Sequence, residues 1–290
     1  MSALFRILWF VVTSPIRLIA WFARSIVAGF KTFFIEEPVD TPLGDTVQKA
    51  VENPGDLLTH LAALRGHLLR SALALILMAG VVFSYSPQLL DWLAQPIGGV
   101  AELQAIEVTE PIGVVMRITL ITAFAISLPY ISFELLLFAA PGLSRRSRFF
   151  GLFAIPLVSV FFLGGMAFTY FYILPQALPF LLGFMDIPTL VRPSSYVTFS
   201  TGLMFWIGIS FEFPLVSYVL SSMGILPASL LRRQWRIAVV LLSVVAAAIT
   251  PTIDPINMLI VWIPLVLLYF LSVGTASLAE RQRLARQARK

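Results

Sequence analysis

The sequence contains no cysteine and few charged residues. Without cysteine, the chain cannot form disulfides, hold an iron–sulfur cluster or use a thiol in catalysis. It also lacks a Walker-type glycine loop, a dinucleotide-binding fingerprint and a metalloprotease helix motif. Charged residues make up 12% of the 290 positions, about half the share usual in soluble domains, while hydrophobic residues make up 59% and the mean hydropathy is +0.91. We therefore expect an integral membrane protein without enzymatic activity.

Six apolar segments are long enough, or nearly so, to cross a membrane as helices, which takes ~20 residues each. They are Ser71–Leu90, Ile112–Phe133, Phe149–Ile173, Val197–Ser221, Ile237–Ile249 and Ile256–Val273. The third opens an uncharged run of residues 149–185, which we expect to leave the bilayer near Pro175 and Pro179. The fifth is short and a tight hairpin joins it to the sixth, so we expect local thinning of the bilayer there. The sequence thus predicts an all-α, polytopic protein with six transmembrane helices.

Basic residues are concentrated in alternate connections between these spans. Eighteen of the 20 lysines and arginines precede span one, join spans two and three or spans four and five, or follow span six. The other connections contain Arg117 and Arg192 together with six acidic residues. The positive-inside rule therefore predicts that both termini are cytoplasmic, in a cytoplasmic (inner) membrane. Because the positive charge follows this pattern, we expect no binding of nucleic acid.

The chain divides into four predicted parts. Residues 1–37 carry Arg17, Arg24 and Lys31 at intervals of seven, which lines one face of an interfacial amphipathic helix on the cytoplasmic leaflet. A secretory signal peptide is the alternative interpretation of this segment. Residues 38–59 are a polar linker, 60–276 the membrane domain, and 277–290 a basic cytoplasmic tail.

Glu212 is the one charged residue between Pro193 and Leu231. A carboxylate at the centre of a membrane helix costs at least ~2.5 kcal/mol, so such residues usually face a polar cavity, change protonation or hold a helix bundle together. A structural, hydrogen-bonded carboxyl and a working site are equally compatible with this pattern.

Three other polar residues have mainly structural interpretations. His60 and His67 are seven residues apart and could share a helix face, but without cysteine or a carboxylate pair nearby we expect no metal site. Glu134, at the end of span two, either snorkels or caps the packing there, or titrates. Arg117 is a candidate to neutralise outer-loop acids such as Glu110.

Seven groups of short motifs occur in a fixed order relative to the spans. They are His60-Leu61 with Leu64-Arg65, Thr109-Glu110-Pro111, Pro129 with residues 138–143, residues 165–171 with Pro175, Phe211-Glu212-Phe213-Pro214, Thr250-Pro251 with Asp254-Pro255, and Leu268-Tyr269. This order resembles the TatC family, the multispanning receptor of twin-arginine protein translocation, over about residues 56–276.

The resemblance implies a glove-shaped, six-helix receptor with its concave face in the membrane. Proteins of this family bind the twin-arginine signal peptides of folded cargo at their cytoplasmic face. They assemble with TatA- and TatB-type single-span proteins and with other TatC copies, and the proton-motive force drives transport. No cofactor is implied.

The resemblance also implies three groups of site residues. The cytoplasmic, signal-binding face comprises His60, Leu64, Arg65, Phe138, Pro141, Leu143 and Arg148. The intramembrane cavity comprises Glu212, Phe211 and Pro214. The outer loops contribute Pro96, Glu110, Pro111, Pro251 and Asp254.

The chain departs from the family where two glutamates usually receive the arginine pair of the signal. Ala63 and Ser147 occupy those positions, so the carboxylates that pair bidentately with guanidinium groups are absent. N-terminal acids, either Glu52 and Asp56 or the pair at residues 36–37, could supply the missing charge. We favour the alternative that this is a divergent paralogue that supports a more typical copy and binds signals weakly itself.

Two other functions compete with the receptor. One is proton-coupled transport of a small solute with Glu212 as the proton relay, although the repeated halves usual in transporters are not evident. The other is a membrane assembly factor without a transport role.

Overall fold

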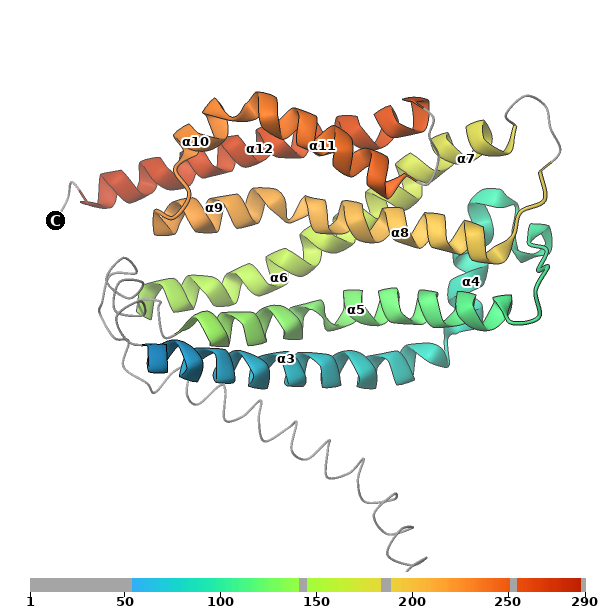
Figure 1. Cartoon of the computed structure of the whole chain (residues 1–290), viewed down its shortest axis with the longest axis horizontal. Coiled ribbons are helices and arrows are strands. Elements are labelled where there is room, and N and C mark those ends of the chain that lie inside the picture. Colours follow the sequence, from blue (N-terminus) through green and yellow to red (C-terminus); the bar gives the residue numbers. More distant parts are fainter. Residues whose placement is uncertain (1–53, 141–144, 184–188, 251–254, 288–290) are drawn as a thin grey trace, which may run out of the picture. The chain divides into compact units, whose positions relative to one another are not determined.

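The computed structural model describes the backbone of residues 54–140, 145–183, 189–250 and 255–287, and nearly all of it is helical (Figure 1). The α-helices are α3 (Pro54–Phe83), α4 (Ser86–Ala94), α5 (Glu110–Ala139), α6 (Arg145–Phe168), α7 (Leu174–Leu182), α8 (Pro193–Phe211), α9 (Phe213–Met223), α10 (Ala228–Arg233), α11 (Trp235–Ile249) and α12 (Pro255–Gln287). A π-helical stretch, η4 (Thr169–Ile173), joins α6 to α7, and two short 3-10 helices, η1 (Gln95–Ile97) and η2 (Val100–Glu102), follow α4. In these residues the β-structure is limited to one isolated bridge between Leu103 and Val191. The all-α prediction is confirmed.

The chain forms two compact units. One comprises Met1–Ala74 and Pro129–Pro156, and the other comprises Leu75–Leu128 and Leu157–Lys290. The second unit contains most of the described core, which is formed by residues of α4, α5, η4, α7, α8, α11 and α12. Within it, α12 lies alongside α9 and α11 (Figure 1).

Five described helical segments are long and apolar enough to cross a membrane. They are Ala62–Phe83, Glu110–Ala139, Gly151–Leu182, Pro193–Met223 and Pro255–Ala285. The predicted fifth span coincides with α11, which has 15 residues and is shorter than a usual span. The multispanning character is therefore confirmed, and bilayer thinning near α11 stays a prediction.

Two predicted span boundaries are wrong. The first apolar helix ends at Phe83 rather than Leu90, because the chain turns at Ser84 and a new helix begins at Ser86 with a proline in its first turn. The third does not end at Ile173, since helical backbone continues through Pro175 to Leu182. Pro175 lies in the first turn of α7, directly after the π-helical stretch, where its missing N–H costs little.

The ends of the described chain also differ from the predicted division. Helix α3 begins at Pro54, inside the predicted 38–59 linker, and α12 continues to Gln287, through most of the predicted tail. The predicted amphipathic helix over 1–37 lies outside the described residues.

Two tyrosine hydroxyls attach the short helix α4 to the core of the second unit. Tyr170 donates to the Trp92 carbonyl at 2.7 Å and Tyr196 donates to the Leu93 carbonyl at 2.5 Å. The Trp92 and Tyr170 rings are stacked, with centroids 3.9 Å apart. These bonds reach the last turn of α4, where carbonyls lack the partner four residues on; the Trp92 carbonyl also accepts from the Gln95 N–H.

Candidate functional site

Glu212 lies at the break between α8 and α9. Helix α8 ends at Phe211 and α9 begins at Phe213, with Glu212 between them. Pro214 has no N–H to donate back to the preceding turn, which explains why the regular hydrogen-bond ladder is interrupted here. The Glu212 N–H donates to the Ile209 carbonyl at 3.0 Å, a tighter turn than an α-helix makes. The sequence therefore places a carboxyl at a local irregularity in a membrane-spanning segment.

The carboxyl of Glu212 is buried without a hydrogen-bond partner. Both of its oxygens are inaccessible, and neither accepts a hydrogen bond from any residue that the structure describes. A buried polar group in that condition costs ~1–3 kcal/mol. The group can accept a hydrogen bond from another molecule, or carry a proton itself.

The helices beside Glu212 approach each other closely. A Cβ built on Gly165 of α6 would lie 2.8 Å from the Cα of Gly208 on α8 and 2.9 Å from the Phe211 ring. A Cβ on Gly208 would lie 2.9 Å from the Phe162 ring, which is itself 1% exposed. Only glycine permits this crossing, as is common between membrane helices. One side of the Glu212 break is thus closed by tightly packed apolar groups.

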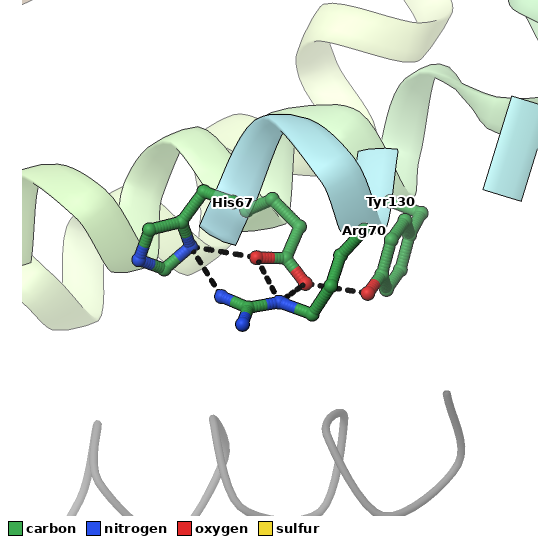
Figure 2. A network of polar contacts seen from close by, with 4 residues as sticks. His67, Arg70 and Tyr130 are labelled. Atoms are coloured by element: carbon green, nitrogen blue, oxygen red, sulfur yellow. Dashed lines mark hydrogen bonds and ion pairs between the residues drawn. The ribbon is translucent and has the colours of Figure 1, made fainter. Parts of the chain in front are cut away.

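A second buried carboxyl, Glu134, lies in a polar network of the first unit with His67, Arg70 and Tyr130, which are labelled in Figure 2. It is 1% exposed, and the single Nε–H of Arg70 is shared between its two carboxylate oxygens, at 2.9 and 3.0 Å. Tyr130, one turn earlier on α5, donates to the same carboxylate at 2.5 Å. His67 Nδ1 lies 2.7 Å from Glu134 Oε2 and 2.8 Å from Arg70 Nη2. Glu134 is therefore paired and hydrogen-bonded within the protein, unlike Glu212.

A third cluster joins the start of α5 to the start of α8. Glu110, 6% exposed, accepts hydrogen bonds from the backbone N–H of Ser194 at 2.9 Å, from the Ser194 hydroxyl and from the Ile106 N–H at 3.1 Å. Arg192 forms ion pairs with Glu110 at 3.5 Å and with Glu107 at 3.2 Å. The Glu110 carboxylate raises the pKa of the Arg192 guanidinium above its ordinary value. The predicted pairing of Arg117 with Glu110 is wrong, because Arg192 forms the ion pair with Glu110.

Comparison with known proteins identifies the chain. A sequence model of the family described as "Sec-independent protein translocase protein (TatC)" matches residues 59–264. The chain belongs to the TatC family. A TatC protein of Koribacter versatilis is 30% identical over 243 residues, which are 80% of this chain and 90% of the relative. One from Aquifex aeolicus is 32% identical over 235 residues, which are 78% of this chain and 97% of the relative.

A solved structure agrees with this family. The structure described as "Crystal Structure of Twin Arginine Translocase Receptor- TatC" superposes with a TM-score of 0.68 at 30% identity, covering 76% of this chain and 99% of the other. The predicted resemblance is confirmed: this chain is a multi-pass membrane protein and a TatC-type component of the Sec-independent protein translocase.

The structure describes some of the predicted TatC site residues and not others. Five predicted residues lie outside the described part of the chain: Glu52, Pro141, Leu143, Pro251 and Asp254. Three lie in described helices without a described side chain: Asp56, His60 and Arg148. The predicted signal-binding role of the cytoplasmic residues is thus a proposal.

The remaining predicted residues have clear positions. Leu64 and Phe138 are half-buried and Arg65 is exposed, and the Phe138 ring meets the His67 ring edge-on with centroids 6.0 Å apart. On the α4 side, Pro96 lies in η1, and Pro111 is exposed at the start of α5.

Sequence reasoning missed the network around Glu134. The sequence suggested only that His67 and His60 could share a helix face, and it indicated no partner for Glu134. A signal was available, because His67 and Arg70 are three residues apart and Tyr130 and Glu134 four, spacings that place each pair on one helix face. The sequence does not show that these two pairs contact each other, because Arg70 and Tyr130 are 60 positions apart along the chain.

Proposed function

We propose that this TatC-family chain is a receptor and core subunit of a twin-arginine translocase. It binds signal peptides of folded cargo at its cytoplasmic face and TatA- and TatB-type single-span proteins in the membrane, and the proton-motive force drives transport. The single observation that supports this is the Glu212 carboxyl, buried at a helix break without an internal partner. A polar group on a partner's helix would supply the missing hydrogen bond.

The proposal includes a location and an assembly. The chain lies in the cytoplasmic (inner) membrane with both termini in the cytoplasm, as the distribution of its basic residues favours. It acts by binding rather than by catalysis, and it assembles with other TatC copies. Glu212, Phe211 and Pro214 line the intramembrane cavity that receives a partner helix.

The cytoplasmic side offers few free carboxylates for a twin-arginine signal. Ala63 is exposed on α3 and cannot pair with a guanidinium. Glu134 is the one acid with a described side chain in the first unit, and Arg70 already occupies both of its oxygens. This supports a paralogue that assists a typical TatC, while Glu52 and Asp56 are the acids that would substitute if the chain binds signals alone.

Restoring the two glutamates should strengthen signal binding. Ala63→Glu with Ser147→Glu adds two carboxylates, and a charge-assisted hydrogen bond contributes ~1.5–3 kcal/mol, so we expect at least a tenfold lower Kd for a twin-arginine peptide. Fluorescence anisotropy with the purified protein measures this. The matched Gln/Gln variant and a twin-lysine peptide are the controls. An unchanged Kd would locate recognition elsewhere.

Site-specific photocrosslinking tests the receptor function. A photoreactive residue at Phe213, which is 48% exposed beside Glu212, should capture single-span Tat proteins in membranes, whereas one at Ile76 on α3 should not. Absence of such adducts at 213, in a protein that is present in the membrane, would contradict the proposal. Proton-coupled solute uptake by liposomes containing this chain alone would instead favour a transporter.

A further inference from the structure

Arg117 is a charged residue on the exposed surface of a membrane-spanning helix. It lies on α5, and its neighbours Ile112, Met116 and Leu120 on the same helix are exposed apolar side chains. An arginine among such side chains is costly in a membrane and usually marks a function. The described ion pairs do not include Arg117, so its charge is not neutralised by any residue that the structure describes.

The first turns of α5 and α8 run side by side in matching register. Glu110 contacts Ser194 at one level, and Arg117 contacts Thr201 at the next. Both steps are seven residues, or ~10 Å along a helix. Arg117 therefore lies about two helical turns from the N-terminal ends of α5 and α8, where Glu110 and Ser194 are located. A long side chain at that depth can reach toward the membrane surface.

Two neutral acceptors on α8 hold the guanidinium in place. Arg117 Nε donates to the Thr201 hydroxyl oxygen at 3.1 Å, and Nη2 donates to the Thr198 carbonyl at 3.4 Å. The Thr201 hydroxyl uses its own proton on the Val197 carbonyl at 2.5 Å, so its oxygen is free to accept. A Cβ on Gly202 would lie 3.6 Å from Arg117 Nη2, so the guanidinium lies against this glycine. The guanidinium is thus oriented, with most of its five N–H donors still available.

An oriented, uncompensated guanidinium fits a phosphate, which accepts hydrogen bonds from two of its nitrogens at once. The nearest acids of the α5–α8 junction, Glu107 and Glu110, are already paired with Arg192. The exposed apolar flanks, including Trp206 on α8 at 49% exposure, suit acyl chains. These features favour a lipid over a soluble anion.

We propose that Arg117, seated on the Thr198–Gly202 turn of α8, binds the phosphate of an anionic phospholipid. The lipid belongs to the leaflet at the N-terminal ends of α5 and α8. Its headgroup would neutralise Arg117, and its acyl chains would lie along the exposed apolar residues of α5. This site is separate from the Glu212 break and does not depend on the proposed receptor function.

Native mass spectrometry of the purified full chain tests this site. The probes are phosphatidylglycerol and phosphatidylcholine, added separately in neutral detergent. The wild-type chain should bind phosphatidylglycerol preferentially, and Arg117→Gln should weaken that binding about tenfold. Arg117→Lys should retain part of it, because an ammonium group is a point charge without the bidentate geometry. Arg233→Gln, which removes an exposed arginine of α10, is the matched control and should leave the preference unchanged.

A second variant keeps the proposal falsifiable if Arg117→Gln does not fold. Gly202→Leu retains the arginine but fills the space against its guanidinium, and it should also weaken phosphatidylglycerol binding. Equal binding by the folded Arg117→Gln and wild-type chains would overturn the proposal. So would displacement of the lipid by inorganic phosphate alone, which would assign the site to a free anion. The proposal would also be overturned if a photoreactive residue at position 117 captured an acidic partner helix and the Arg117→Gln chain still bound phosphatidylglycerol as the wild-type chain does.

Discussion

Glu212→Ala is expected to reduce protein transport at least tenfold while the protein still accumulates in the membrane. The expectation follows from the state of the carboxyl, whose two oxygens are buried and accept no hydrogen bond from the described residues. Removing a group without an internal partner leaves no other group unsatisfied and relieves the cost of its burial, so the free energy of unfolding should fall by no more than about 1 kcal/mol. A partner helix that donates to the carboxyl would lose its acceptor. Transport of a twin-arginine reporter and the amount of membrane-integrated chain are the two measurements.

Glu212→Gln separates polarity from charge in the same assay. The amide retains a carbonyl acceptor, so it should retain more transport than alanine if hydrogen bonding to a partner is what matters. An equal loss of transport in Glu212→Ala and Glu212→Gln would indicate that transport depends on the charge or the proton of the carboxyl group. Loss of Glu212→Ala from the membrane would contradict the functional interpretation, because it would mean that the carboxyl is needed for folding.

Glu134→Ala should have the opposite profile, with a large loss of stability. Glu134 is 1% exposed and neutralises Arg70, whose guanidinium donates to both carboxylate oxygens. Breaking a fully buried ion pair by removing one partner costs about 3–5 kcal/mol, and because the Arg70 side chain is 21% exposed we expect a loss at the lower end, about 3 kcal/mol. Equilibrium unfolding in detergent, with helicity as the readout, measures the difference.

The double variant Arg70→Leu with Glu134→Leu tests the cause of that loss. Replacing both charges by apolar groups removes the pair without leaving either member unsatisfied, so much of the stability should return. His67→Ala alone should cost less, since it leaves the Arg70 and Tyr130 hydrogen bonds to Glu134 in place. If Glu134→Ala changes the free energy of unfolding by less than about 1 kcal/mol, the network is not what holds this unit together.

Hydropathy was sufficient to predict the helical, multispanning fold, because a membrane helix must carry its apolar residues in one continuous segment. Glu212 could be singled out for the same reason, as the one charge in a long apolar stretch. Helix ends were less predictable. The break after Phe83 depends on a turn before Pro87, and the continuation past Pro175 depends on a π-helical stretch that has no simple sequence signal.

Partners that are distant along the chain could not be predicted. Arg117 was the predicted candidate to neutralise Glu110 and is much nearer to it in sequence, but Arg192 forms the ion pair. Which arginine pairs with Glu110 depends on the position of the residues just before α8. Val191 forms a bridge with Leu103, and this bridge brings Arg192 to the start of α5. A single sequence contains no information on that bridge.

The ring nitrogen of His67 is approached by two groups that make incompatible demands on it. If Nδ1 carries a proton, it donates to Glu134, and the Arg70 NH2 group 2.8 Å away meets another donor. If Nδ1 is bare, it accepts from Arg70, and its lone pair opposes a carboxylate oxygen 2.7 Å away. The location of one hydrogen atom thus selects which neighbour the imidazole favours, so the same four side chains have two alternative bonding patterns.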